Sequence, residues 1–178
     1  MVARTSQPHS NELGFTLVEL LVVISITAVL MAIAIPAFSS ILSSSRLRGV
    51  ADGLMADLRF AMTESTKRGS DLWVSFQNEP DGSNWCYGLS LNNSCDCRTA
   101  NDCVIDGIEK VSQANPALLA DPSSPNYVFK PKRSTVTAGN ITFHADNGKE
   151  IRVVISGYGR IRPCSPAGAA YLSGYPTC

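Results

Sequence analysis

The chain has 178 residues, and its 15 Lys and Arg balance 15 Asp and Glu, so its formal net charge at pH 7 is zero. This length suffices for one domain with an anchor but not comfortably for two domains, and a neutral total excludes bulk charge as a guide to the partner. The distribution of charge is uneven. Residues 130–178 carry seven Lys and Arg against two acidic residues, whereas residues 46–129 carry seven against eleven. The C-terminal part can therefore carry a local basic patch.

An apolar stretch occupies residues 14–38, GFTLVELLVVISITAVLMAIAIPAF, and Glu19 is the only charged residue between its start and Arg46. About 20 such residues can span a bilayer as one helix. A charge inside hydrocarbon costs roughly 2.5–3.5 kcal/mol on insertion scales, so it usually has a partner. For Glu19 we expect the free amino group of a new N-terminus at Phe15, on a neighbouring subunit.

Residues 1–14 form a short polar leader that precedes this stretch. A secretory signal peptide is cut after its apolar region, whereas cleavage at the end of this leader keeps the membrane helix on the mature chain. Arg46 and Arg48 follow the span on the side opposite the leader. That placement runs against the usual enrichment of Lys and Arg on the cytoplasmic side.

Six positions in and before the span form one pattern: Gly14, Phe15, Thr16, Leu17, Glu19 and Pro36. The pattern resembles the N-terminus of type IV pilins and pseudopilins. The resemblance implies that a prepilin peptidase cuts after Gly14 and methylates Phe15, and that Glu19 aligns the subunit during assembly. It implies an α+β type IV pilin fold, in which a long N-terminal α-helix, membrane anchor plus amphipathic half, packs on an antiparallel β-sheet domain. The expected location is the inner membrane, with a single pass and a periplasmic domain, and then an extracellular pilus with other pilins.

The helical pattern continues beyond Pro36. Its apolar positions recur at three- and four-residue steps, at Leu47, Val50, Leu54, Leu58 and Met62. Such an amphipathic stripe is typical of core packing on a sheet, and Lys67-Arg68-Gly69 is a typical helix end. We therefore divide the chain into a leader at 1–14, a membrane half of the helix at 15–38, an amphipathic half at 39–69 and a β-sheet domain at 70–178.

Strand patterns fill the β-sheet domain. Residues 72–76 predict a short apolar strand, residues 85–91 alternate as in a half-buried strand, and residues 104–111 are a further candidate. Residues 141–144 and 150–156 flank Asp146-Asn147-Gly148, a strong hairpin signal. We expect loops at 92–102 and at 113–126, the latter because it is rich in proline.

Six cysteines in a small chain with an export-like N-terminus predict disulfides. A pair between Cys164 and Cys178 would close a loop of about 15 residues, worth about 3 kcal/mol in the chain-entropy model. The others, Cys86, Cys95, Cys97 and Cys103, allow three pairings, of which Cys95 with Cys97 is the least favourable sterically and the other two stay open. A zinc site is the alternative, but the spacings do not resemble C-x2-C knuckles, so we expect no metal.

The segment Gly159-Arg160-Ile161-Arg162, just ahead of Cys164, is the most informative part of the domain. Two arginines at i and i+2 of an extended chain leave on one side, about 6–7 Å apart, and guanidinium groups can grip phosphates bidentately. From composition alone, two solvated charges beside a turn are the favoured interpretation, and a resemblance changes this. The motif is similar to the GRxR motif of FimT-type minor pilins of the GspH/FimT family, which bind DNA in natural transformation. The resemblance implies that Arg160 and Arg162 contact double-stranded DNA.

Five further cations could extend this patch: Lys130, Lys132, Arg133, Lys149 and Arg152. For two of them we also weighed simpler explanations, solvation in the hairpin turn for Lys149 and a surface ion pair with Glu150 for Arg152. Tyr158 can stack on a base, although an aromatic residue beside a turn more often packs on its own domain.

Three functions fit these patterns. The first is a DNA-receptor minor pilin of the FimT type, the second a structural or priming minor pilin of the FimU type, and the third a type II secretion pseudopilin of the GspH type. Catalysis is not expected, because the only histidines are His9 and His144 and there is no nucleophile–base spacing and no phosphate-cradling loop. No cofactor is expected either.

Overall fold

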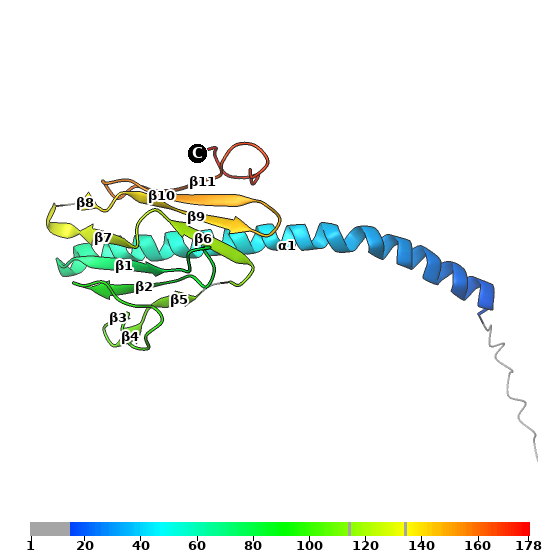
Figure 1. Cartoon of the computed structure of the whole chain (residues 1–178), viewed down its shortest axis with the longest axis horizontal. Helices are drawn as coiled ribbons and strands as arrows, with labels where there is room; N and C mark the ends of the chain where they lie inside the picture. The colour runs from blue at the N-terminus through cyan, green and yellow to red at the C-terminus, as the bar shows by residue number, and fades with distance from the viewer. Residues whose placement is uncertain (1–14, 114, 134) are drawn as a thin grey trace, which may run out of the picture. The chain divides into compact units, whose positions relative to one another are not determined.

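The computed structural model describes residues 15–113, 115–133 and 135–178. One helix, α1 (Leu17–Arg68), precedes all the strands (Figure 1). The chain divides into two units, one ending at Ser39 and one formed by residues 40–178. In the first unit α1 exposes apolar side chains, including Leu17, Val22 and Phe38.

Thr16 caps the start of α1. Its carbonyl accepts a hydrogen bond from the Leu20 N–H at 3.2 Å, and its Oγ1 accepts one from the Glu19 N–H at 3.2 Å. A threonine at this position satisfies N–H groups that the helix itself cannot pair. The other end lies where the sequence predicts it, because Gly69 follows Arg68 with a φ of +64°, a conformation that favours glycine.

Two larger antiparallel sheets and one two-stranded sheet, of residues 104–105 and 108–109, build the second unit. The first has the order β5-β2-β1-β7-β8 and the second the order β11-β10-β9-β6. The strands of the first sheet are β1 (Leu72–Gln77), β2 (Cys86–Leu91), β5 (Val111–Gln113), β7 (Asn126–Lys130) and β8 (Thr135–Val136). Those of the second are β6 (Leu118–Pro122), β9 (Gly139–Ala145), β10 (Glu150–Ile155) and β11 (Ile161–Cys164). A 3-10 helix, η1 (Pro131–Arg133), joins β7 to β8.

The core lies between the amphipathic half of α1 and both sheets. Leu47, Leu54 and Leu58 of the predicted stripe are fully buried, with partly buried Val50 beside them. They pack in one cluster with inward residues of both sheets, such as Val74 and Phe143. The sheets are also joined directly, since Trp85 Nε1 donates to the Leu118 carbonyl at 2.9 Å and the Tyr127 hydroxyl donates to the Asn140 carbonyl at 2.8 Å.

The hairpin predicted from residues 141–144 and 150–156 is confirmed, and β9 pairs with β10 from Glu150 opposite His144 to Ile155 opposite Gly139. Two other predictions were wrong. Residues 104–111 do not form one strand, because Asp106 and Gly107 both have a positive φ and turn the chain between β3 (Val104–Ile105) and β4 (Ile108–Glu109). Residues 113–126 are not one loop, because they contain β6.

The strand at residues 86–91 was expected to be half-buried and is instead covered on both faces. Tyr87 and Leu89 face the core, whereas the opposite face carries Cys86 and Gly88 beneath the loop that follows β2. Two disulfides, Cys86–Cys97 and Cys95–Cys103, tie that loop down. They select one of the two pairings that the sequence left open and engage all four cysteines of the alternative zinc site.

Candidate nucleic-acid interface

A tight turn joins β10 to β11 and carries the predicted motif. The Ser156 N–H donates to the Arg160 carbonyl at 3.0 Å, and the Gly159 N–H donates to the Ser156 carbonyl at 2.9 Å. The Ser156 Oγ accepts a further hydrogen bond from the Arg160 N–H at 3.0 Å. Gly159 has a φ of +79°, which costs little only for glycine. The backbone therefore presents Arg160 from a fixed position.

The helix supports this turn from beneath. Gly159 is buried, and a Cβ built on it would lie 3.0 Å from Met62 Cε, 3.2 Å from Met62 Sδ and 3.5 Å from Val136 Cγ2. Met62 was predicted to belong to the core stripe, but its side chain is 41% exposed. That prediction was wrong because Met62 lies at the edge of the packed face, under the turn.

The two arginines lie on the outer face of the second sheet. Ile161 pairs with buried Ile155 and Arg162 pairs with half-buried Val154, so alternation along β11 turns Ile161 inward and the arginines outward. Both arginines are exposed. Among the described residues, neither guanidinium has a carboxylate within 4.0 Å. Their charges are available to a ligand.

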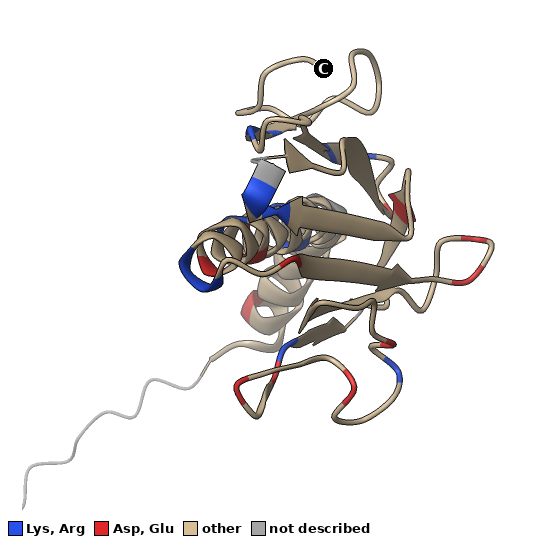
Figure 2. Ribbon diagram, turned by 90° about the vertical axis from the view of Figure 1, so that its left-hand side faces the viewer, with Lys and Arg blue, Asp and Glu red and all other residues tan. Residues whose placement is uncertain are grey.

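Two of the expected helper residues lie on the segment beside the turn. The Val136 N–H of β8 donates to the Gly157 carbonyl at 2.9 Å, and Lys130 and Tyr158 line one shared cavity of about 150 Å³. Tyr158 is 89% exposed, so it does not pack on the domain as an aromatic residue beside a turn more often does. Lys132 is exposed on η1, and the side chain of Arg133 lies outside the described part of the chain. Figure 2 shows Lys and Arg around η1, whereas the lower loops carry several Asp and Glu.

The remaining two helper residues differ in position. Arg152 is on the same outer face as Arg162, in the adjacent strand, but its Nε donates to Thr142 Oγ1 at 3.1 Å. The ion pair that we weighed between Arg152 and Glu150 is not found among the described residues, and Glu150 Oε1 lies 3.1 Å from His144 Nδ1 instead. Lys149 precedes β10 at the end away from the turn, and its Nζ donates to the Ala169 carbonyl at 2.9 Å.

The C-terminal tail holds the end of β11. Cys164 is bonded to Cys178, the predicted pair. Ser165 Oγ donates to the Glu150 carbonyl at 2.8 Å and accepts a hydrogen bond from the N–H of buried Leu172 at 2.8 Å. The tail (orange to red in Figure 1) therefore folds back onto the sheet beside β10 and β11.

Sequence reasoning missed the residues that position the turn, chiefly Met62 and Val136. The one available signal was the pair Gly157 and Gly159, since a glycine is needed where another backbone or side chain comes close. The glycines indicate that a position in the turn is crowded, but not which residues lie against it, because α1 and β8 are distant from the turn in sequence.

The N-terminal motif lies on the other unit. Phe15 and Glu19 are exposed at the start of α1, and Gly14 lies outside the described residues. An 18-residue window of α1 has a mean hydropathy of 2.7, so by length and composition this helix can cross a membrane.

Comparisons with known proteins agree with this description. Residues 50–159 match the family model of the type II transport protein GspH, and residues 9–35 match the prokaryotic N-terminal methylation motif. No curated protein sequence matches the chain.

Two solved structures share the fold. The type IV minor pilin FimU of Pseudomonas aeruginosa is 15% identical with a TM-score of 0.51, over 71% of this chain and 96% of that one. The minor pseudopilin EpsH of the Vibrio cholerae type 2 secretion system is 14% identical with a TM-score of 0.50, over 68% and 98%. The predicted type IV pilin fold is thereby confirmed, and the family is one of structural subunits and not of enzymes. This chain belongs to the GspH family of minor pilins and pseudopilins.

Proposed function

We propose that this chain is a minor type IV pilin that binds extracellular double-stranded DNA through Arg160 and Arg162, for DNA uptake in natural transformation. One observation carries the proposal. Arg162 lies on the outer face of β11 and Arg160 directly precedes this strand, and both are exposed and without a carboxylate partner among the described residues. Two fixed, unpaired cations suit a polyanion better than a protein surface of mixed charge.

The ligand contact is to phosphate. Guanidinium groups bind phosphate oxygens bidentately, and phosphate contacts carry no base information, so binding is independent of sequence. Lys130, Lys132 and Arg152 extend the patch around the turn, whereas Lys149, at the far end of β10, does not belong to it. One subunit binds in the range typical of non-specific association, about 10⁻⁴–10⁻⁶ M. Many copies in a filament raise this through avidity.

The experiment is a salt titration of DNA binding by residues 40–178, the unit that contains the whole core and all three disulfides. The double variant Arg160→Gln/Arg162→Gln should bind several unrelated duplexes equally weakly. The slope of log affinity against log salt should fall by roughly 0.9 for each lost phosphate contact. The control variant Arg46→Gln/Lys110→Gln removes the same charge from two sites outside the turn and should bind as the wild type does.

A structural minor subunit is the second candidate, and the GspH family match together with the fold shared with FimU and EpsH favours it. An experiment in cells distinguishes the two candidate functions. A DNA receptor that carries the double glutamine substitution should still assemble into pili but take up little DNA. If that variant transforms and binds DNA like the wild type, the receptor function is refuted and the structural function replaces it.

Assembly depends on the N-terminal motif in either case. The match to the methylation motif at residues 9–35 supports cleavage by a prepilin peptidase and association with other pilins, and we place the cut after Gly14. Glu19 then pairs with the Phe15 amine of a neighbouring subunit. Mass spectrometry should find a mature chain that begins with methylated Phe15. Glu19→Ala should insert into the membrane normally, because it removes a charge from hydrocarbon, but should fail to enter filaments.

A further inference from the structure

A cavity lies where α1 enters the second unit. Its volume is about 550 Å³, and its walls come from the first turns of α1 in this unit, the β9–β10 turn and the C-terminal tail. The lining residues that matter here are Ser40, Ser44, Arg48, Lys149 and Ser173. Two of them are cations and three are serines. The Ser44 hydroxyl donates to the Ser40 carbonyl at 2.9 Å, whereas the Ser40 hydroxyl can donate a hydrogen bond to a ligand. This cavity is at the end of β10 away from Arg160 and Arg162, so it is separate from the DNA site.

The two cations are held in place but not neutralised. Arg48 Nη2 donates to the Ser173 carbonyl at 3.0 Å, and Lys149 Nζ donates to the Ala169 carbonyl at 2.9 Å. Among the described residues, no carboxylate lies within 4.0 Å of either group. Guanidinium has five N–H donors and ammonium three, so most of the donors stay open to a ligand. The carboxylates nearest in the chain are Glu150, whose Oε1 lies 3.1 Å from His144 Nδ1, Asp52, one turn beyond Arg48, and Asp146 in the β9–β10 turn.

Hydrogen bonds hold the β9–β10 turn against α1 at the cavity. Asn147 Nδ2 donates to the Ser40 carbonyl at 3.1 Å and to Ser44 Oγ at 3.0 Å, which fixes the β9–β10 turn against the helix. Lys149 follows in the same turn, and its backbone N–H donates to Asn147 Oδ1 at 3.1 Å. The two cations therefore approach one cavity from elements that are locked together.

The cavity residues on α1 directly follow the candidate membrane span in the sequence. A span of about 17–25 residues that begins at Phe15 ends no later than Ser39, directly before the first lining residue. The headgroup layer adds roughly 5–7 Å on each side of the hydrocarbon. Arg48 lies about 12 Å beyond Ser40 along the helix at 1.5 Å per residue, and helical side chains tilt toward the N-terminus. Arg48 can therefore reach back to the headgroups.

We propose that this cavity binds the phosphate of an anionic phospholipid headgroup in the periplasmic leaflet while the chain is a membrane subunit. Arg48 and Lys149 supply the charge, and the Ser40 hydroxyl donates a hydrogen bond to a remaining oxygen. The proposal accounts for Arg48, one of the two arginines that follow the span against the usual charge bias, because it serves a lipid site on that side. The same side chains hold the C-terminal tail, so the lipid and the tail share their anchors.

The experiment uses the full chain in mild detergent and native mass spectrometry with equal amounts of phosphatidylglycerol and phosphatidylcholine of matched acyl chains. We expect preferential retention of phosphatidylglycerol, and a large excess of inorganic phosphate should not displace it. A cation beside an anionic surface contributes about fivefold in affinity. Arg48→Gln/Lys149→Gln should therefore reduce this retention by about tenfold or more.

Two controls keep the outcome interpretable. Arg59→Gln/Lys110→Gln removes the same charge outside the cavity and should retain the lipid. Arg48→Lys/Lys149→Arg keeps both the charge and a donor for each tail carbonyl and should also retain it, which separates lipid binding from tail detachment. Equal retention of the two lipids by the wild type overturns the proposal, as does displacement by free phosphate, since that would indicate a simple anion site.

Discussion

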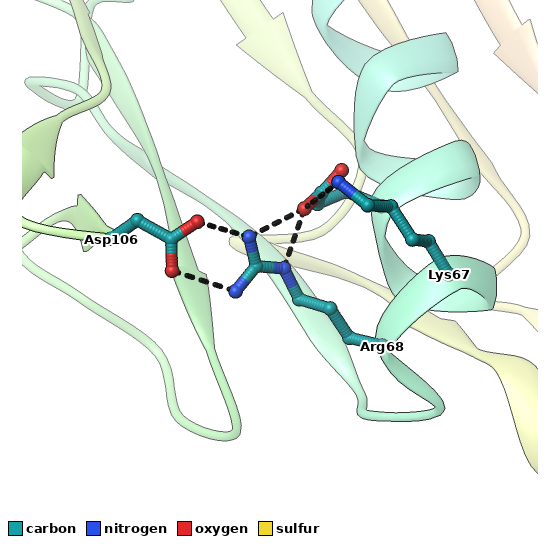
Figure 3. Close-up of polar contacts among 4 residues, drawn as sticks. Lys67, Arg68 and Asp106 are labelled. Atoms are coloured by element: carbon teal, nitrogen blue, oxygen red, sulfur yellow. Dashed lines mark hydrogen bonds and ion pairs between the residues drawn. The ribbon is translucent and has the colours of Figure 1, made fainter.

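Two of the arginine sites in the second unit have contrasting surroundings. Arg68 ends α1, and its Nε and Nη2 lie 2.5 Å from Glu64 Oε1 while its Nη1 donates to Asp106 Oδ1 at 2.7 Å (Figure 3). Its Nη2 also contacts Asp106 Oδ2. Arg160 and Arg162 have no such partners among the described residues. Arginine thus forms ion pairs within the fold at one site and is an unpaired, exposed cation at the other.

The difference shows how to separate structural from binding cations in a chain whose net charge is zero. The guanidinium of Arg68 lowers the pKa of both Glu64 and Asp106. These three charged side chains bind one another and so join the end of α1 to the β3–β4 turn. A cation that is saturated in this way cannot also grip a phosphate. The two sites should therefore respond differently to mutation, in stability at the first and in binding at the second.

The largest loss of stability should come from adding one methyl group at Gly88, on the face of β2 that lies beneath the disulfides. A Cβ at Gly88 would lie 2.1 Å from Cys103 Sγ and 3.1 Å from Cys95 Sγ. Overpacking of this kind costs about 1–3 kcal/mol, and the cross-linked loop cannot move aside freely. Gly88→Ala should therefore lower the thermal midpoint, measured by circular dichroism, while the folded protein binds DNA normally.

Gly53→Ala is the matched control for that change. It adds the same methyl group where nothing lies within 4 Å, on an exposed face of α1, and alanine is preferred to glycine in helices by about 0.5–1 kcal/mol. Its thermal midpoint should rise slightly. Equal midpoints for the two variants would contradict the close packing of β2 beneath the disulfides.

A second, smaller effect tests the support of the basic turn. Gly159→Ala forces a residue with a Cβ to a φ of +79° and against Met62, at a cost of about 1–3 kcal/mol for the backbone conformation alone. Because Arg160 follows directly, DNA affinity should fall although no charge is removed. Gly148→Ala imposes a similar φ, +73°, in open space at the other end of β10, and should leave DNA affinity unchanged.

Much of the fold could be predicted because its signals are local. The stripe at Leu47, Leu54 and Leu58, the glycine after Arg68 and the Asn147-Gly148 turn each depend on neighbouring residues. The prediction of a loop at residues 113–126 was wrong because proline was taken to exclude a strand. β6 is an edge strand that pairs only with β9 and has Pro122 at its end, and edge strands tolerate proline.

The site was only partly predictable for the same reason. Two arginines at i and i+2 leave one face of any extended chain, so their common direction follows from spacing. The contact of Gly159 with Met62, the place of Arg152 beside Arg162 and the absence of Lys149 from the patch depend on how α1, β10 and β11 are arranged. Those relations join residues distant in sequence, and no local pattern records them.

The third prediction concerns acid. A carboxyl whose pKa is lowered on folding stabilises the native state above its unfolded pKa, and this contribution is lost as pH falls through the folded pKa. The ordinary values are 4.5 for Glu64 and 3.8 for Asp106, and the hydrogen bonds from Arg68 hold the pKa of each below them. Thermal midpoints should therefore decline as pH falls below about 4.5.

Arg68→Gln should flatten this decline, because both carboxyls then return toward their ordinary pKa values. Some acid sensitivity should persist, since the Ser83 hydrogen bonds lower the pKa of Asp81 independently. If the variant and the wild type lose stability in parallel from neutral pH to pH 2, the Arg68 contacts do not carry the effect.

The smallest expected effect is the sharpest test of the comparison. Arg160→Gln/Arg162→Gln should leave the thermal midpoint unchanged, because exposed substitutions away from caps, cores and buried networks usually stay within about 0.5 kcal/mol. Arg68→Gln removes one charge where the double variant removes two, yet at neutral pH it should be the less stable, since it leaves Glu64, a buried residue, without its closest cation. Differential scanning calorimetry of the three proteins at one pH and salt concentration measures this order. A drop in the double variant comparable to that of Arg68→Gln would mean that the β11 arginines also fasten the fold, and their loss of DNA binding could then no longer be read as loss of phosphate contacts alone.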